Sequence, residues 1–229
     1  MNKNKVDFDY FAENYNNTII KASKFISKSN FDYFANYKIK RLKSAITFQP
    51  LKILDYGCGI GNLVPEIKKN FPNSEIYGHE VSKKSLGVAL SRFPYLKKFN
   101  VNDRYDLIIF CGVFHHCSES EQLEIFNSLE NITKKNSKVV VFEHNPKNFI
   151  TRRIVRNCEL DKDAILIDIK SLINKFEKEN YKCENYEFIF FLPPILRILN
   201  FIEYFLKKIP FGCQYFTIYK KSEVLNDYK

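Results

Sequence analysis

The stretch Leu-Lys-Ile-Leu-Asp-Tyr-Gly-Cys-Gly-Ile-Gly-Asn, residues 51–62, decides the fold predicted for this chain. Ile53 and Leu54 indicate a short buried strand, and Asp55 ends it. Three glycines follow at every second position, and apolar residues take helical spacing from Leu63 onward. A strand, a glycine turn and a helix open a nucleotide-binding α/β unit, because glycines let a ligand approach the backbone closely.

The spacing of the glycines separates two classes of cofactor. A dinucleotide fingerprint, G-x-G-x-x-G, would place its third glycine at position 62, where this chain has Asn62. The pattern D-x-G-x-G-x-G resembles instead the first motif of the class I S-adenosylmethionine-dependent methyltransferases. That resemblance implies that the glycine turn lies against the amino acid moiety of S-adenosylmethionine. A nicotinamide-dependent oxidoreductase is the alternative enzyme.

A second strand is expected over residues 74–80, and it ends in Glu80, 19 residues beyond Gly61. An acidic side chain at that distance can accept hydrogen bonds from both ribose hydroxyls of an adenosine. Ser82 is a natural N-cap for the helix that follows. These features predict an adenosine at the end of the second strand.

An apolar run over residues 105–111 predicts a buried central strand, with a third strand before it over 99–101. The run leads into Gly-Val-Phe-His-His, which resembles the fourth-strand motif of the same methyltransferases. The resemblance implies that these residues lie near the adenine and the sulfonium of S-adenosylmethionine. The expected cofactor-binding residues are Asp55, Gly57, Cys58, Gly59, Gly61, Asn62, Glu80, Val81, Ser82, Cys111, Gly112, Val113 and Phe114.

Histidines gather at the sheet edge where ligands bind. His115 and His116 follow the fourth strand, and His144 follows a fifth strand expected over residues 138–142. Histidine suits a general base because its ordinary pKa lies near neutrality. We expect His144 to act as the base, with Glu143 orienting it and His115 as the second candidate. Tyr15 is also expected at the site, among the catalytic residues, because the resembled family packs N-terminal helices over its cofactor.

We expect no metal ion at these histidines. Catechol-type methyltransferases bind magnesium through carboxylate oxygens, and no pair of aspartates lies at these strand ends. The adjacent His115 and His116 also do not easily share one metal geometry.

The stretch Phe-Glu-His-Asn-Pro-Lys-Asn, residues 142–148, resembles a subgroup of small bacterial class I methyltransferases. Members of that subgroup also carry a tail similar to residues 210–215, Pro-Phe-Gly-Cys-Gln-Tyr. The resemblance spans nearly the whole chain. It supports the fold and the cofactor but does not identify the substrate.

The chain has 229 residues, 45% hydrophobic and 27% charged, which is ordinary for a globular protein. We predict a single methyltransferase domain over 1–229, with an N-terminal helical cap (1–48) and a catalytic core (49–229) that carries a helical insertion (193–210). The expected fold is the α/β, Rossmann-like, seven-stranded class I methyltransferase sheet, with an antiparallel seventh strand and helices on both faces.

The formal net charge of +10 is compatible with nucleic acid or an anionic membrane as a partner. The lysines are spread along the chain, so we do not expect nucleic acid. Residues 195–209 carry an apolar stripe with Lys207 and Lys208 beside it. Packing of this stripe on the sheet is the default expectation; a lid, a dimer face and peripheral membrane contact are the alternatives. The polar residues 1–10 predict no signal peptide, and we expect a cytoplasmic protein.

The function predicted from these motifs is methyl transfer from S-adenosylmethionine to a small molecule, at oxygen or nitrogen. The alternatives are an RNA methyltransferase, an NAD(P)-dependent oxidoreductase, and a catalytically silent cofactor-binding subunit that serves a partner protein. The motifs predict neither the acceptor nor the oligomeric state.

Overall fold

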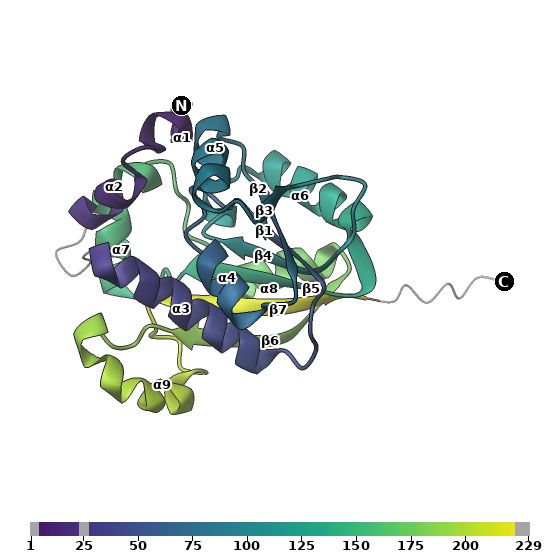
Figure 1. Cartoon of the computed structure of the whole chain (residues 1–229). Helices are drawn as coiled ribbons and strands as arrows, with labels where there is room; N and C mark the ends of the chain where they lie inside the picture. Colours follow the sequence, from purple (N-terminus) through teal and green to yellow (C-terminus); the bar gives the residue numbers. More distant parts are fainter. Residues whose placement is uncertain (1–4, 23–27, 223–229) are drawn as a thin grey trace.

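A computed structural model describes residues 5–22 and 28–222, and within them seven strands form one sheet (Figure 1). The strand order is β3-β2-β1-β4-β5-β7-β6. β7 runs antiparallel to both of its neighbours, and the remaining pairs are parallel. The strands are β1 (Lys52–Tyr56), β2 (Glu75–His79), β3 (Leu96–Lys98), β4 (Tyr105–Cys111), β5 (Thr133–His144), β6 (Tyr181–Ile189) and β7 (Gln214–Lys221). This is the predicted methyltransferase sheet, with the predicted antiparallel seventh strand.

Helices cover both faces of this sheet, and the alternation of side chains along the central strands explains why. Ile53 faces a cluster with α3 and α4, whereas its neighbour Leu54 faces a cluster with α6 and α8. Ile108 and Ile109 divide between the two clusters in the same way. The helices are α1 (Phe8–Phe11), α2 (Tyr15–Ala22), α3 (Lys28–Ala45), α4 (Val64–Asn70), α5 (Lys83–Arg92), α6 (Glu119–Ile132), α7 (Phe149–Asn157), α8 (Ile169–Lys178) and α9 (Asn200–Leu206), with 3₁₀ turns η1 (Phe114–His116), η2 (Glu159–Asp161) and η3 (Pro194–Leu199).

The register of the parallel strands brings the site residues to one edge. Asp55 on β1 lies opposite Gly78 on β2 and Ile109 on β4. The predicted N-cap of α5 is confirmed, because Ser82 Oγ accepts a hydrogen bond from the Ser85 amide at 3.0 Å. The first, second, fourth and fifth strands therefore end side by side, as the sequence predicts.

The third strand was predicted at the wrong residues. It covers 96–98, not 99–101, and pairs Ile76 with Leu96. Leu96 is its one buried residue, so the segment has no apolar alternation to reveal it. Phe99 lies beyond the strand and packs against Tyr56 and Tyr105. Its apolar character reflects that packing.

The expectation that the stripe of 195–209 packs on the sheet is also wrong. The segment divides into η3 and α9, and Ile195, Ile198 and Phe205 are 87%, 83% and 78% exposed. The buried residue of α9 is Glu203, only 1% exposed. Its carboxylate accepts hydrogen bonds from the amides of three consecutive residues, 190–192, at 2.9–3.1 Å and from Tyr37 Oη at 2.6 Å. These bonds hold the charged side of α9 inward and leave its apolar side outward.

In the part of the chain that the structure describes, no helix has the length and apolar character needed to cross a membrane.

Candidate active site

A cavity of about 450 Å³ lies at the edge where β1, β4 and β5 end. Helices α2 and α3 contribute to one wall, α7 and η2 to another, and the segment 190–194 to a third. The cavity joins the glycine turn after β1 to the histidines after β4 and β5. Among the predicted site residues, those that line it are Tyr15, Asp55, Gly57, Cys58, Gly59, Asn62, Cys111, Gly112, His115, Glu143 and His144.

Asp55 lies at one end of this cavity with an unusual carboxyl group. The residue is 1% exposed, and neither carboxylate oxygen has a hydrogen-bond partner in the structure. Burial, together with the nearby charge of Glu80, raises the pKa of Asp55 to about 7. A buried carboxyl group with free acceptor positions is costly, and it favours a ligand that brings hydrogen-bond donors or positive charge.

The glycine turn beside Asp55 is held in a form that other residues cannot adopt. Gly57 has a φ of +79°, and a Cβ there would lie 2.5 Å from Val113 Cγ2. The amides of Gly57 and Cys58 both donate to the carbonyl of His79, at 2.7 and 2.9 Å. Val113 therefore contributes to the site by packing against the turn, without lining the cavity.

Glu80 fixes the turn from the side of β2. Its Oε2 accepts from the Gly59 amide and its Oε1 from the Ser82 amide, each at 2.9 Å. Glu80, Val81 and Ser82 do not line the cavity. Val81 is 79% exposed, and the Ser82 hydroxyl is bonded to Asp9. The prediction that these three residues contact an adenosine stays a prediction.

Two further predicted cofactor contacts, Gly61 and Phe114, also lie outside the cavity. Gly61, with a φ of +82°, packs its backbone against Phe93. Phe114 is fully buried against the rings of Phe110, Phe126 and Phe176. η1 turns the Phe114 ring toward α6 and α8, and the prediction that Phe114 binds the cofactor stays a prediction.

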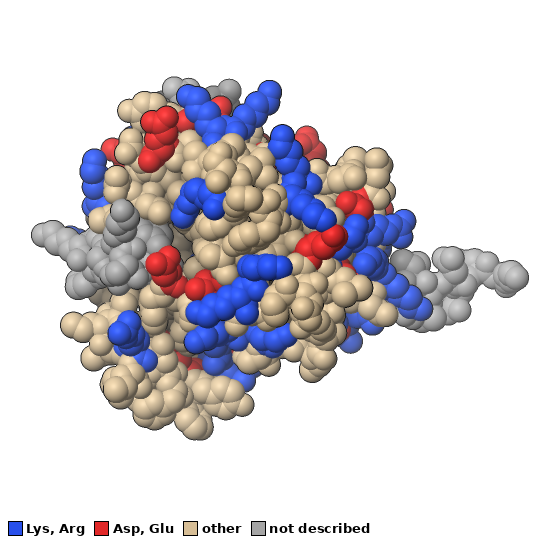
Figure 2. All heavy atoms as spheres, viewed as in Figure 1, with Lys and Arg blue, Asp and Glu red and all other residues tan. Residues whose placement is uncertain are grey.

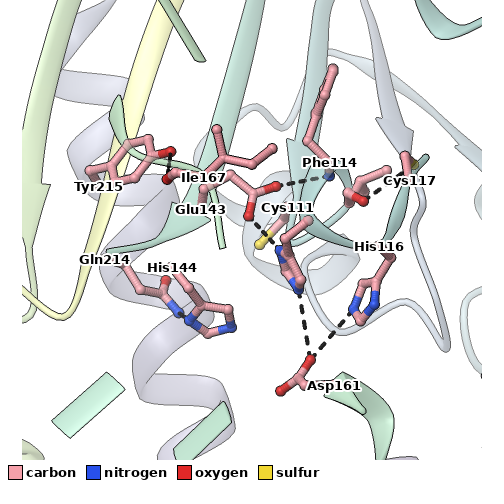
Figure 3. A network of polar contacts seen from close by, with 12 residues as sticks. Cys111, Phe114, His116, Cys117, Glu143, His144, Asp161, Ile167, Gln214 and Tyr215 are labelled. Carbon is pink, nitrogen blue, oxygen red and sulfur yellow. Dashed lines mark hydrogen bonds and ion pairs between the residues drawn. The ribbon is translucent and has the colours of Figure 1, made fainter. Parts of the chain in front are cut away.

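His115 and Glu143 form a buried pair at the other end of the cavity. His115 Nδ1 is bonded to one oxygen of Glu143, and the other oxygen accepts from the Phe114 amide at 2.9 Å (Figure 3). Burial alone would lower the pKa of His115, but the charges of Glu143 and Asp161 raise it to about 10. Burial opposes ionisation of Glu143, but the charge of His115 nevertheless lowers the pKa of that carboxyl. Glu143 thus orients His115, and the prediction that it orients His144 is wrong.

His144 has a different partner and a different charge state. Its Nδ1 lies 3.3 Å from the amide nitrogen of Gln214, while the Gln214 amide oxygen has no partner. The opposite orientation of that amide would let its oxygen accept from Nδ1–H and leave Nε2 free to accept a proton. Burial and the charge of His115 lower the pKa of His144 to about 4. The imidazole is therefore uncharged at neutral pH.

His116 lies beside His115, and both face the same carboxylate. His116 Nε2 is 3.5 Å from Asp161 Oδ1, and His115 Nε2 is 3.7 Å from that same atom (Figure 3). Asp163 Oδ1 lies 3.3 Å from Nδ1 of His116. η1 turns both Nε2 atoms toward Asp161, and the expectation that adjacent histidines do not easily share one metal geometry stays a prediction.

Tyr15 lines the cavity beside the glycine turn, and its hydroxyl is also influenced by the charge of Asp161. A Cβ on Gly59 would lie 3.9 Å from its ring, and burial raises the pKa of its hydroxyl. On the same helix, Asn16 Oδ1 accepts from Asn62 Nδ2 at 2.9 Å. α2 therefore covers the glycine turn. The prediction that Tyr15 takes part in catalysis stays a prediction.

Two residues that sequence reasoning missed also line the cavity. Lys38 on α3 places Nζ 3.1 Å from Cys111 Sγ, and it lies one helical turn after the cavity residue Phe34. That spacing is a signal that could have located it. Asp161 lies in the short turn η2, which follows α7 without any pattern that marks it.

The sequence and the fold were compared with known proteins. The model of a family described as a methyltransferase domain matches residues 30–186. A search of curated protein sequences found no match. The match to the family model covers more than half of the chain.

Solved structures show the same fold at low sequence identity. A SAM-dependent methyltransferase from Thermotoga maritima, described as a possible histamine N-methyltransferase, is 14% identical, with 94% of this chain and 98% of that chain covered and a TM-score of 0.64. A SAM-dependent methyltransferase from Archaeoglobus fulgidus is 17% identical, with 83% and 94% covered and a TM-score of 0.61. The mitomycin 7-O-methyltransferase MmcR is 12% identical with a TM-score of 0.56; 82% of this chain aligns, over only 54% of that longer protein.

Proposed function

The chain belongs to the class I S-adenosylmethionine-dependent methyltransferases, and on this premise we propose that it methylates an oxygen or nitrogen of a small, largely apolar molecule. The observation that carries the proposal is the single cavity with Asp55 and the glycine turn at one end and His144 and His115 at the other. A methyl donor and an acceptor can therefore meet without solvent between them.

The cofactor end fits S-adenosylmethionine. The cofactor carries an ammonium and a sulfonium group, and Asp55 offers two carboxylate oxygens without partners. Gly59 leaves room between the turn and Tyr15. When bound, S-adenosylmethionine supplies an electrophilic methyl group, so the protein mainly positions the acceptor and removes its proton.

The acceptor end is walled mainly by apolar side chains, which supports an acceptor with an apolar body. These side chains come from α7 and from the segment after β6: Ile150, Ile154, Phe190, Phe191, Leu192, Pro193 and Pro194. A few polar groups among apolar walls orient a small ligand. His144 is the residue we propose as general base for a hydroxyl or amine; His115, whose pKa lies at about 10, would first have to lose its own proton.

The test is release of S-adenosylhomocysteine. We expect the purified protein to bind S-adenosylhomocysteine by calorimetry, to bind NADH far more weakly, and to turn over S-adenosylmethionine with members of a panel of phenols, alkyl alcohols and amines. Stronger binding of NADH would instead favour the oxidoreductase. Cofactor binding without turnover on any acceptor, but with turnover restored by a partner protein, would favour the silent subunit.

The RNA alternative has its own signature. Binding of RNA through phosphates falls steeply as salt rises. Figure 2 shows basic side chains spread over the visible face and interspersed with acidic ones. We therefore expect weak RNA binding with little salt dependence, and a steep dependence together with RNA methylation would overturn the small-molecule proposal.

A further inference from the structure

His115, His116 and Asp161 each point one ligand atom at a common point on the cavity wall. The two Nε2 atoms and the Asp161 oxygen lie within 4.8 Å of one another. The distances from Asp161 Oδ1 to the two nitrogens are 3.7 and 3.5 Å. Both are too long for good hydrogen bonds. Ligands of a tetrahedral Zn²⁺, about 2.1 Å from the ion, lie about 3.4 Å apart. The two distances to Asp161 Oδ1 are therefore close to the spacing that such an ion needs, and the distance between the two nitrogens is at most 4.8 Å.

The second nitrogen of each histidine is held by a carboxylate. His115 Nδ1 is bonded to Glu143, and His116 Nδ1 lies 3.3 Å from Asp163. This arrangement fixes both Nε2 atoms toward Asp161. Metal-binding histidines almost always donate their other ring N–H to a carboxylate or carbonyl in this way. The carboxylates thus supply the outer support that a metal site requires.

Backbone contacts hold the two halves of the cluster together. The Ile165 amide donates to the His115 carbonyl at 2.8 Å, which ties the segment after η2 to η1. The second oxygen of Asp163 accepts from the Val6 amide at 2.9 Å. Asp161 is therefore placed against the histidines by the fold and is not a mobile surface acid.

The charges around the cluster also favour a cation. Three carboxylates, Glu143, Asp161 and Asp163, surround two imidazoles, and their side chains are 0%, 13% and 11% exposed. Buried carboxylates require compensation by positive charge. A divalent ion would provide it in place of the proton that His115 holds, because a metal-binding imidazole must be neutral and the ion displaces its proton.

From this geometry we propose that His115, His116 and Asp161 bind a divalent transition-metal ion of the Zn²⁺ type. Two imidazoles and one carboxylate form a three-ligand set that leaves a coordination position open. All three residues line the cavity, so the open position faces the acceptor end. There the ion would bind an acceptor hydroxyl and ease loss of its proton. That role rests on the proposed function, whereas binding of the ion does not.

The test measures metal binding without cofactor or acceptor. Untagged protein, freed of metal with a chelator, is titrated with Co²⁺ while its visible absorption is followed, and Zn²⁺ is then added to displace the Co²⁺. We expect one Co²⁺ per chain and the visible bands of a low-symmetry nitrogen and oxygen site. Loss of the outer carboxylate in Asp163→Asn should weaken binding about 10–100-fold, and Asp161→Asn should weaken it further.

Matched controls keep this test decisive. Asp103→Asn changes an aspartate that pairs with Lys52, remote from the cluster, and should bind Co²⁺ as the wild type does. Binding of S-adenosylhomocysteine by each variant shows that it is folded. The proposal is overturned if folded wild type takes up no stoichiometric Co²⁺ or Zn²⁺ at micromolar concentration. It is also overturned if folded Asp161→Asn binds as wild type does, or if a strong thiolate band places the metal on cysteines.

Discussion

Asp55 is buried with a raised pKa, and this makes the stability of the cofactor-free protein depend on pH. The pKa is about 7 in the folded chain and about 3.9 in an unfolded one. Between these values the folded state holds the proton more tightly, so its stability falls as pH rises from about 4 to 7. The full span corresponds to at most about 4 kcal/mol.

The Asp55→Asn variant should remove this dependence. We expect it to melt at a higher temperature than wild type at pH 8, with little difference at pH 4.5, and to bind S-adenosylhomocysteine more weakly. Thermal melts across this range and calorimetry measure both effects. A melting difference that stays constant with pH would contradict the buried, proton-binding state of Asp55.

His144 is the residue on which the proposed chemistry most depends. It is uncharged at neutral pH and lines the acceptor end of the cavity. We expect His144→Ala to keep its affinity for S-adenosylhomocysteine and to lose about 10²-fold or more in turnover, since a positioned base contributes that much. Turnover equal to that of the wild type would show that His144 serves packing and not catalysis. Loss of both turnover and cofactor affinity would indicate a structural role.

At the scale of elements, α9 is held to the cavity wall by one side chain. Glu203 accepts from the amides of residues 190–192 and from Tyr37 Oη. A glutamine at this position would turn an NH₂ group toward one of these donors. We expect Glu203→Gln to lower the unfolding free energy by about 1–3 kcal/mol, or about 2–4 °C in Tm for each kcal/mol.

The control for this prediction is Glu124→Gln, the same change at an exposed position of α6. It should leave the melting temperature nearly unchanged. If Glu203→Gln behaves like Glu124→Gln, the carboxylate does not hold the segment 190–192.

The elements also show where sequence reasoning succeeds and fails. β1 and β4 were predictable because both of their faces are buried and their apolar runs are unbroken where they cross the core. The position of α9 was predicted wrongly because an apolar stripe does not reveal which surface it packs against. Here the hydrogen bonds of Glu203 turn the charged side of the helix inward, and the apolar side faces outward. The partner of Glu143 depends on a separation of about 30 residues and on the turn of η1, which no local pattern encodes. No local sequence pattern marks Asp161 as a site residue either, because it lies in the short 3₁₀ turn η2.

At the scale of the whole molecule, the surface formed by α9 and η3 has few charged side chains. The outer face of α9 and η3, formed by Ile195, Ile198, Phe201 and Phe205, is 65–87% exposed, and Figure 2 shows it mainly in tan. The chain as a whole has a formal charge of +10, which complements anionic lipid. We propose that this face rests on an anionic membrane surface. Lys207 and Lys208 contribute little, because their ammonium groups contact Glu187 and Asn185 of β6 at 3.2 and 3.1 Å.

The prediction is that a Phe201→Ser and Phe205→Ser double variant sediments less with vesicles of mixed anionic and neutral phospholipid than wild type does. Tyr10→Ser, at an equally exposed aromatic residue of α1, is the control and should sediment as wild type. Equal sedimentation of all three proteins would rule out this contact. Loss of a wild-type dimer in the double variant, seen by light scattering, would assign the face to self-association instead.

Glu203 has a consequence for regulation. The Glu203 carboxylate links α9, whose outer side faces solvent, to the amides of three successive residues in the wall of the acceptor end. A displacement of α9 would therefore pass through these three hydrogen bonds to the backbone of the cavity wall. We expect a contact on the outer face of α9 to alter the position of residues 190–192, and with it the volume open to the acceptor.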